Sequence, residues 1–298
     1  MPLDLPEELA RSVGQLGAND SLTMASTPDG RLLVGAGSVL RILDRSMRVL
    51  QTVPGECNGW VDAADDNAIF FSFTASLRRC TYDLTFVAQY ELLQGYYSAG
   101  YVVLAPGDLL FCVMYPVNVE VMYPVNVEIR DYEQRDEIIA LDAQTMQLRY
   151  RFGLGLLSDA KHMCVIADEL FVCDNGNNRV QVFSLTGEHR RSISGEWMHP
   201  QHLCFVSGRL YLHVDPHLDD QEATFSISVA RRILVLSLQG DILQEFTHPS
   251  ENAVEFLSIC YFDHKLLVSF YEEDYDADGD PKYSYGMLAL QDRYRERL

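Results

Sequence analysis

Short runs of apolar residues, separated by residues that favour turns, recur along the whole chain. The clearest example is residues 162–195, HMCVIADELFVCDNGNNRVQVFSLTGEHRRSISG, where Ala-Asp, Asp-Asn-Gly-Asn-Asn and Thr-Gly interrupt the apolar runs. Apolar runs rich in Val, Ile and Phe and bounded by Gly, Asn and Asp are typical of strands joined by tight turns. This stretch therefore predicts one small sheet of four short antiparallel strands.

The same arrangement repeats with a period of roughly 40 residues, a length typical of repeat architectures. Cys164, Cys204 and Cys260 each stand six residues before a leucine, so three of the units share one register. Six candidate units follow from the pattern, at about residues 22–54, 58–94, 96–153, 157–195, 198–248 and 253–298.

One such sheet cannot bury both of its faces, whereas six arranged radially bury one another. The sequence therefore predicts an all-β, six-bladed β-propeller with four-stranded blades that forms a single domain over residues 1–298. Residues 10–16 contain Arg-Ser-Val-Gly, similar to Arg191–Ser194, and are predicted to close the last blade as its outermost strand. Five or seven blades are alternatives, and a β-sandwich is a weaker one because sandwiches need no fixed register.

Residues 170–187, LFVCDNGNNRVQVFSLTG, resemble the NHL-repeat family of β-propellers. The resemblance lies in an apolar strand, the pattern D-x-G-N-x-R, the strand V-x-V-F and a turn that ends in glycine. It implies a propeller fold. Within the motif we expect Asp174, Asn177 and Arg179 to serve the structure of the turn, and Gly176 to supply a positive φ.

Charge and composition narrow the possible functions. The chain has 23 Lys and Arg against 43 Asp and Glu, so a polyanion is repelled, and nucleic-acid binding through a basic face, which some NHL-type propellers use, is excluded. The chain has no apolar stretch of about 18 residues, so no membrane insertion is predicted. The first residues lack a secretory signal, and the seven cysteines show no close pairing, so we expect a cytoplasmic protein.

Three insertions interrupt the repeats, at residues 113–136, 214–231 and 271–285, each between the second and third strand of its unit. Loops of this class project from one face of a propeller, and long loops are often functional. The insertions are acidic, which predicts a docking face for a partner protein with a basic surface; the alternative is a set of solvated loops that keeps the protein soluble. The residues predicted for this face are Tyr115, Tyr123, Glu128, Asp131, Asp219, Asp220, Glu272 and Glu273.

The first insertion contains the octapeptide VMYPVNVE twice in succession, at residues 113–120 and 121–128. An arm built from this duplication would expose Met, Tyr and Val and would form a sticky surface. A neutral expansion with no function is the alternative.

Two sets of residues are candidate metal ligands, although no cofactor is required by the sequence. Asp274, Asp276, Asp278 and Asp280 alternate around Gly279, as the ligands of calcium loops do, but Lys282 and Tyr285 stand where further ligands are expected. The alternative is an acidic hairpin tip.

His162 and His202 share one repeat position, and with His199 they form a candidate zinc set at the central channel. Amidating lyases of the NHL family use a channel metal of this kind. The alternative is that these histidines only bind water and backbone groups.

No nucleophile elbow, phosphate-binding glycine loop or H-E-x-x-H motif is present, so the sequence names no catalytic residue. We therefore predict a non-catalytic scaffold for protein interactions that uses an acidic, loop-decorated propeller face. The alternative is a metal-dependent hydrolase or lyase, using calcium or zinc, with its site at the central channel.

Overall fold

The structure is a computed structural model that describes residues 22–37, 39–54, 63–65, 67–73, 76–92, 96–116, 136–214, 232–247, 253–275 and 281–290. Within these ranges the chain forms β-strands and a single 3-10 turn, η1 (Asn175–Asn177). No helix in the described part of the chain is long and apolar enough to cross a membrane.

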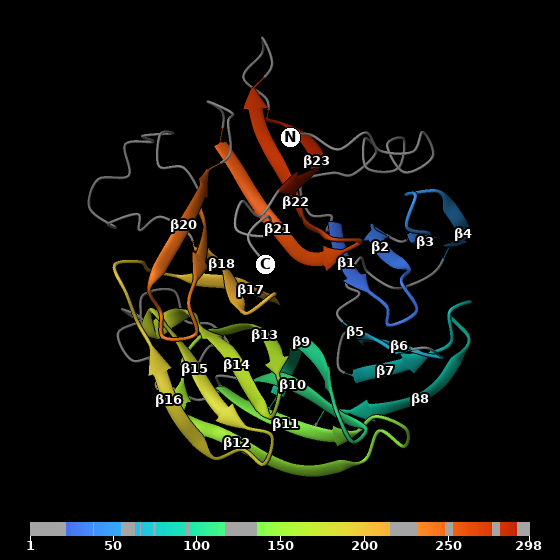
Figure 1. Cartoon of the computed structure of the whole chain (residues 1–298). Helices are drawn as coiled ribbons and strands as arrows, with labels where there is room; N and C mark the ends of the chain where they lie inside the picture. The colour runs from blue at the N-terminus through green and yellow to red at the C-terminus, as the bar shows by residue number, and fades with distance from the viewer. Residues whose placement is uncertain are drawn as a thin grey trace, which may run out of the picture. The chain divides into compact units, whose positions relative to one another are not determined.

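The strands follow one another as antiparallel neighbours in six sheets (Figure 1). The first three sheets contain β1 (Leu22–Ser26), β2 (Leu32–Ala36), β3 (Val39–Leu43) and β4 (Val49–Pro54); β5 (Ala63–Ala64), β6 (Ile69–Phe73), β7 (Ser76–Cys80) and β8 (Phe86–Glu91); and β9 (Tyr96–Ala105), β10 (Leu109–Pro116), β11 (Asp136–Asp142) and β12 (Leu148–Leu157). The next two contain β13 (Ala160–Ile166), β14 (Glu169–Asp174), β15 (Arg179–Ser184) and β16 (His189–Ile193); and β17 (Pro200–Val206), β18 (Arg209–Val214), β19 (Arg232–Leu236) and β20 (Ile242–Thr247). The last contains β21 (Ala253–Phe262), β22 (Lys265–Tyr275) and β23 (Pro281–Leu290).

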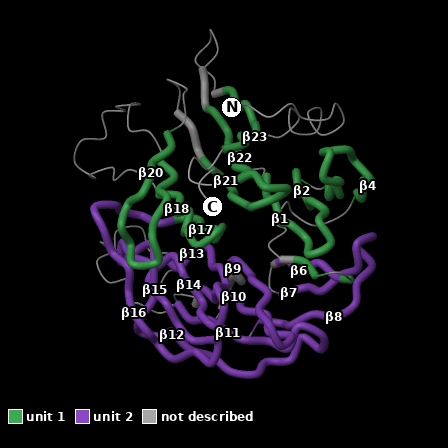
Figure 2. The backbone as a smooth tube through the Cα atoms, in the orientation of Figure 1, with its two compact units in different colours: residues 1–67, 201–298 green, residues 68–200 purple. Residues whose placement is uncertain are grey.

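The chain divides into two compact units, residues 1–67 with 201–298 and residues 68–200 (Figure 2). In the first unit, one apolar cluster joins β1 and β2 to β21–β23, and Ser269 Oγ donates a hydrogen bond of 2.7 Å to the carbonyl oxygen of Leu22. A second cluster joins β17–β19 to β21–β23. In the second unit, the main cluster joins β10–β12 to β13–β15. Each cluster packs the face of one sheet against its neighbour.

Repeated turn chemistry explains why the strands end where they do. The first two strands of the later sheets are joined by tight turns with two positive φ angles, 49° and 82° at Ser207 and Gly208 and 43° and 65° at Asp263 and His264. Such turns match the twist of the flanking strands. They fix the register of each hairpin, and with it the face to which each apolar residue points.

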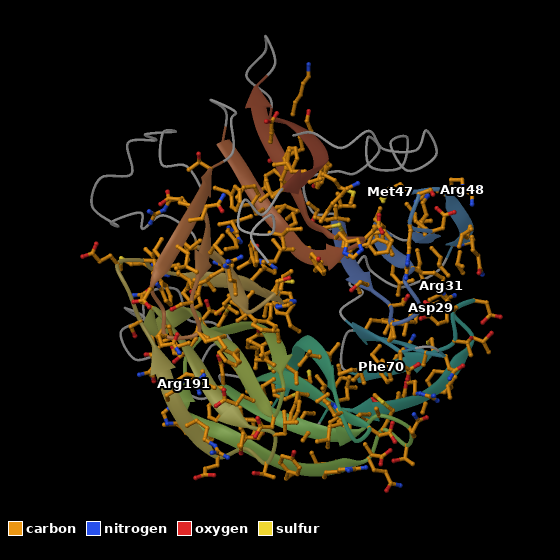
Figure 3. All side chains as sticks on the ribbon, in the orientation of Figure 1. Asp29, Arg31, Met47, Arg48, Phe70 and Arg191 are labelled. Atoms are coloured by element: carbon orange, nitrogen blue, oxygen red, sulfur yellow. The ribbon has the colours of Figure 1, made fainter. Side chains whose placement is uncertain are left out.

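The third and fourth strands are joined by a turn that a polar side chain caps. Asp44 Oδ1 accepts hydrogen bonds from the backbone amides of Ser46 and Arg48 at 2.9 and 3.0 Å. Ser237 Oγ accepts equivalent bonds from Gln239 and Asp241 at 3.2 and 3.1 Å. These side-chain oxygens accept hydrogen bonds from backbone amides of the turn, which have no partner in the strand ladder. Figure 3 shows Met47 and Arg48 in the first of these turns, and the fully buried Phe70 on β6.

The predicted boundaries of the insertions need correction. Residues 113–116, 136 and 214 belong to strands β10, β11 and β18. In the third insertion, Tyr271–Tyr275 pair with Pro281–Tyr285 as a continuation of β22 and β23, so most of this segment is strand rather than loop. Polar and aromatic residues alternate over Lys282–Tyr285 on β23, whereas β22 carries three consecutive acids, Glu272–Asp274. The backbone ladder does not require apolar side chains.

The sixth sheet has three strands among the described residues. Residues 10–16, predicted to supply its fourth strand, lie outside the described ranges.

Candidate functional site

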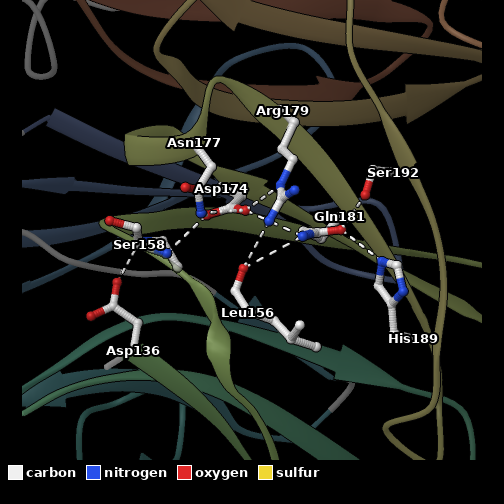
Figure 4. A network of polar contacts seen from close by, with 10 residues as sticks. Asp136, Leu156, Ser158, Asp174, Asn177, Arg179, Gln181, His189 and Ser192 are labelled. Atoms are coloured by element: carbon white, nitrogen blue, oxygen red, sulfur yellow. Dashed lines mark hydrogen bonds and ion pairs between the residues drawn. The ribbon is translucent and has the colours of Figure 1, made fainter. Parts of the chain in front are cut away.

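Asp174, at the end of β14, is the centre of a polar network in the second unit (Figure 4). Its carboxylate is fully buried and accepts hydrogen bonds from Arg179 Nε at 2.8 Å and from Asn177 Nδ2 at 2.8 and 3.0 Å. The backbone amide of Ser158 donates a further bond of 2.9 Å. A buried carboxylate is tolerated when its lone pairs are filled in this way.

The same network ties the turn of the fourth sheet to the segment that precedes it. Arg179 also donates to the carbonyl oxygen of Leu156 at 3.1 Å, and the amide of Gly176 donates to the carbonyl oxygen of Ser158 at 2.9 Å. Leu156 and Ser158 lie at the junction of β12 and β13. The side chains of the motif therefore bind the backbone of the link between the third and fourth sheets.

On its other side the turn binds the link to the next sheet. Asn178 Oδ1 accepts from the backbone amide of His199 at 2.8 Å, and Asn175 Nδ2 donates to the carbonyl oxygen of Pro200 at 3.3 Å. One turn thus fastens two links.

The expected role of Gly176 was wrong, because the residue with positive φ in this turn is Asn178, at 54°. Glycine is required at 176 for a different reason. A Cβ atom there would lie 2.6 Å from Ser158 Oγ and 3.0 Å from the Ser158 carbonyl oxygen. Gly176 allows the turn to approach the link closely.

A chain of polar side chains continues along β15 and β16. When the amide oxygen of Gln181 faces Arg179, it accepts from Nε at 2.9 Å and from a terminal guanidinium nitrogen at 2.7 Å. The amide nitrogen of Gln181 then donates to Ser192 Oγ at 2.7 Å and to His189 Nε2 at 2.8 Å. The Gln181 amide lies between Ser192 and His189 and bonds to both of them. These polar side chains therefore do not form the nucleophile and base pair of a hydrolase.

Tyr115 was expected to contribute to the interaction face from an exposed arm, but it does not lie on one. Its hydroxyl group donates a hydrogen bond of 2.6 Å to the carbonyl oxygen of Ala160 on β13. Burial, with smaller contributions from Tyr101, Asp159, Asp136 and Cys112, raises the pKa of the Tyr115 hydroxyl well above its ordinary value. Tyr115 is a packing residue.

The other residues predicted for the interaction face divide into two groups. Glu272 and Glu273 lie on β22, where they pair with Ser284 and Tyr283 on β23. The remaining predicted residues lie outside the described ranges: Tyr123, Glu128, Asp131, Asp219 and Asp220.

The candidate zinc residues His162 and His202 each contact an aromatic ring. His162 packs edge-on against Tyr101 in the second unit, with 5.3 Å between ring centroids. In the first unit, His202 Nδ1 lies 3.3 Å from Nδ1 of His213, close enough for one shared proton. The third member of the candidate set, His199, has its Nδ1 3.4 Å from Asn175 Oδ1.

The candidate calcium loop begins in a strand, because Asp274 lies on β22 and pairs with Lys282. Asp276, Asp278 and Asp280 lie outside the described residues. Among the residues that the structure describes, no three His, Cys, Asp or Glu side chains come together as a metal site.

Three tyrosines on the extended part of β22 and β23 form a cluster that was not predicted from the sequence. The ring centroid of Tyr271 lies 5.8 Å from that of Tyr283 and 5.7 Å from that of Tyr285. All three rings are partly exposed. Their alternation along 283–285 is a strand signal that the surrounding acids obscured.

These sheets define the class of the protein, a six-bladed β-propeller. The chain matches no model of a known protein family, and no curated protein matches its sequence.

Solved structures share the fold. The WD40 β-propeller domain of Doa1 is 13% identical over 92% of this chain and 79% of its own, with a TM-score of 0.56. A luciferin-regenerating enzyme is 11% identical over 94% of both chains, with a TM-score of 0.58. A protein of unknown function from Bacteroides caccae is 13% identical over 80% of this chain and 82% of its own, with a TM-score of 0.53. At these identities the likeness shows the fold alone.

Proposed function

We propose that this chain is a non-catalytic scaffold, built from repeats of the NHL type, that binds a partner protein with a basic surface through an acidic, loop-decorated propeller face. The proposal is carried by the extension of β22 and β23. These strands pair over Leu266–Tyr275 and Pro281–Leu290, whereas β18 and β19 pair only over Leu210–Val214 and Arg232–Leu236. The extension carries Glu272, Glu273 and Asp274 against the single base Lys282.

The chemistry of the extension fits a basic partner in two ways. Carboxylates attract Arg and Lys over a range set by the ionic strength, and they steer association. Tyrosine rings accept guanidinium and ammonium groups over their faces, and aromatic residues often carry much of the energy of an interface. In the register of β22 and β23, the three tyrosines share one face with Glu273, and Glu272 and Asp274 lie on the other face. The extension therefore offers both kinds of contact, with the aromatic ones on one face.

The scaffold is tested by immobilising the full chain and identifying the proteins that it retains from a lysate of the native cell. We expect partners with basic surfaces that salt releases. A triple variant, Glu272→Gln, Glu273→Gln and Asp274→Asn, should weaken their binding by roughly tenfold or more, because each lost charge pair costs a fraction of a kcal/mol to about 1 kcal/mol.

The matched control changes the net charge equally at a different end of the sheets. Asp168→Asn, Glu188→Gln and Asp263→Asn alter exposed acids in turns, and binding should remain within about twofold of the original. Equal binding by the two triple variants would contradict the proposed face. Stoichiometric zinc or calcium in the purified protein, lost together with a hydrolase or lyase activity after substitution of candidate ligands, would favour the enzyme alternative.

A further inference from the structure

Ala160, the first residue of β13, is held by two side chains of the preceding sheet. Its backbone amide donates a hydrogen bond of 2.7 Å to Asp136 Oδ2, and its carbonyl oxygen accepts one of 2.6 Å from the Tyr115 hydroxyl group. Ala160 itself is fully buried. Both polar groups of one peptide position thus depend on side chains of another sheet, at a site that water does not reach.

The two side chains come from neighbouring strand ends. Tyr115 is next to the last residue of β10, and Asp136 is the first residue of β11, so they flank the first insertion in the sequence. The strands are paired up to Met114 and Glu137. The contact with Ala160 therefore fixes the end of the β10–β11 hairpin against β13.

An ionised Asp136 is unfavourable at this position because burial removes water from its charge. Its side chain is 8% exposed, so its carboxylate loses most of its hydration. The charged groups that act on it from neighbouring elements are Asp159 and Lys161, which form an ion pair of 2.7 Å at the start of β13, and Asp174 on β14, which is paired with Arg179. Tyr115 faces it from β10, and on its own strand Glu137 is paired with Arg151.

The balance of these effects raises the pKa of Asp136, so its carboxyl group stays protonated to a higher pH than that of a free aspartate. Burial raises the pKa of Asp136 from 3.8 to about 6, and the charges of Asp159 and Asp174 act in the same direction. The Ala160 amide and Lys161 oppose the shift. A protonated carboxyl group still accepts the Ala160 hydrogen bond through its carbonyl oxygen, whereas the ionised group must stay unsolvated to keep it.

We propose that Asp136 and Tyr115 form a proton-operated latch, which holds the end of the β10–β11 hairpin on β13 when Asp136 is protonated and loosens when Asp136 ionises. Between about pH 3.8 and pH 6, Asp136 is protonated in the folded chain and ionised in the unfolded chain. Stability from the latch is therefore complete at low pH, and it is lost as the pH rises from about 3.8 to about 6. Near neutral pH the latch is held by the Tyr115 hydroxyl group and by the Ala160 hydrogen bond to an ionised carboxylate that burial destabilises.

The latch is tested by measuring urea unfolding of the full chain from pH 4.5 to 7.5, with and without Asp136→Asn. The asparagine side chain is neutral and its amide oxygen accepts the Ala160 hydrogen bond. Relative to this variant, the unfolding constant of the original protein should rise by up to about a hundredfold over the range, as a pKa shift of about two units requires. Asp168→Asn, at an exposed turn between β13 and β14, should keep the original pH dependence.

Hydrogen exchange separates the latch from a global effect. After correction for intrinsic rates, protection of the Ala160 amide should fall more than that of Phe171 or Val172 as the pH rises, and it should not fall in Asp136→Asn. Tyr115→Phe should lower Ala160 protection at every pH. Identical pH profiles for the original protein and Asp136→Asn would overturn the proposal. If the variant folds poorly, a carbon-13 titration of Asp136 in the original protein decides, and ionisation near pH 4 would overturn it.

Discussion

Replacing Asp174 with alanine should cost roughly 3–5 kcal/mol of unfolding free energy, the loss typical of a buried ion pair that keeps only one partner. The substitution removes the acceptor for Arg179 Nε, for Asn177 Nδ2 and for the Ser158 amide together. Each donor left without a partner adds a desolvation penalty. Urea unfolding followed by circular dichroism measures the loss.

Two comparisons separate the pair from the loss of a side chain. Asp44→Ala removes a partly exposed aspartate that pairs with the exposed Arg48 and caps the turn between β3 and β4, and it should cost about 1–2 kcal/mol. In a double-mutant cycle with Arg179→Ala, the stability loss of the double variant should fall short of the sum of the two single losses by about 1–3 kcal/mol. If Asp174→Ala destabilised the protein no more than Asp44→Ala, the network would not stabilise the second unit.

Phe183→Ala should be comparably destabilising, by about 3–5 kcal/mol, because it opens a cavity in a closely packed cluster. Phe183 is fully buried between β10–β12 and β13–β15. Its ring centroid lies 5.2 Å from that of Phe152 and 5.5 Å from the ring of His189, with edge-on geometry in both cases. The substitution therefore removes apolar burial and two aromatic contacts.

The matched control makes the same chemical change at an exposed strand. Phe86 on β8 is 55% exposed, and Phe86→Ala should change the unfolding free energy by about 0.5 kcal/mol or less. Phe183→Leu retains most of the apolar volume, so its cost should lie between the two alanine variants. Similar urea midpoints for Phe183→Ala and Phe86→Ala would show that the cluster does not limit stability.

The prediction of a six-bladed propeller from sequence is confirmed. It was possible because the sequence signals of this fold are local. Apolar runs and polar turns recur with one period, and each turn is made by residues close together in the chain, as at Asp44 and Ser237. The extension of β22 and β23 escaped prediction because its acids obscured the strand signal of the alternating tyrosines Tyr283 and Tyr285. Its ladder is made by backbone groups, which the side-chain pattern does not report.

The site was less predictable, for a physical reason. Asp174 and Tyr115 bond to backbone atoms of Ser158 and Ala160, and any residue type supplies such atoms. The sequence therefore carries no sign of the partner. Gly176 and Asn178 are both turn-forming residues, and only the closeness of Ser158 decides which of them must be glycine.

The turn at Asp174 has a consequence for the order in which the chain folds. It binds Ser158 and Pro200, which lie 16 and 25 positions from their partners Asp174 and Asn175. Closing such short loops costs little chain entropy, and contacts between near neighbours form early. We expect the fourth sheet and its two links to form a folding nucleus, on which the sheets made earlier and later in synthesis assemble.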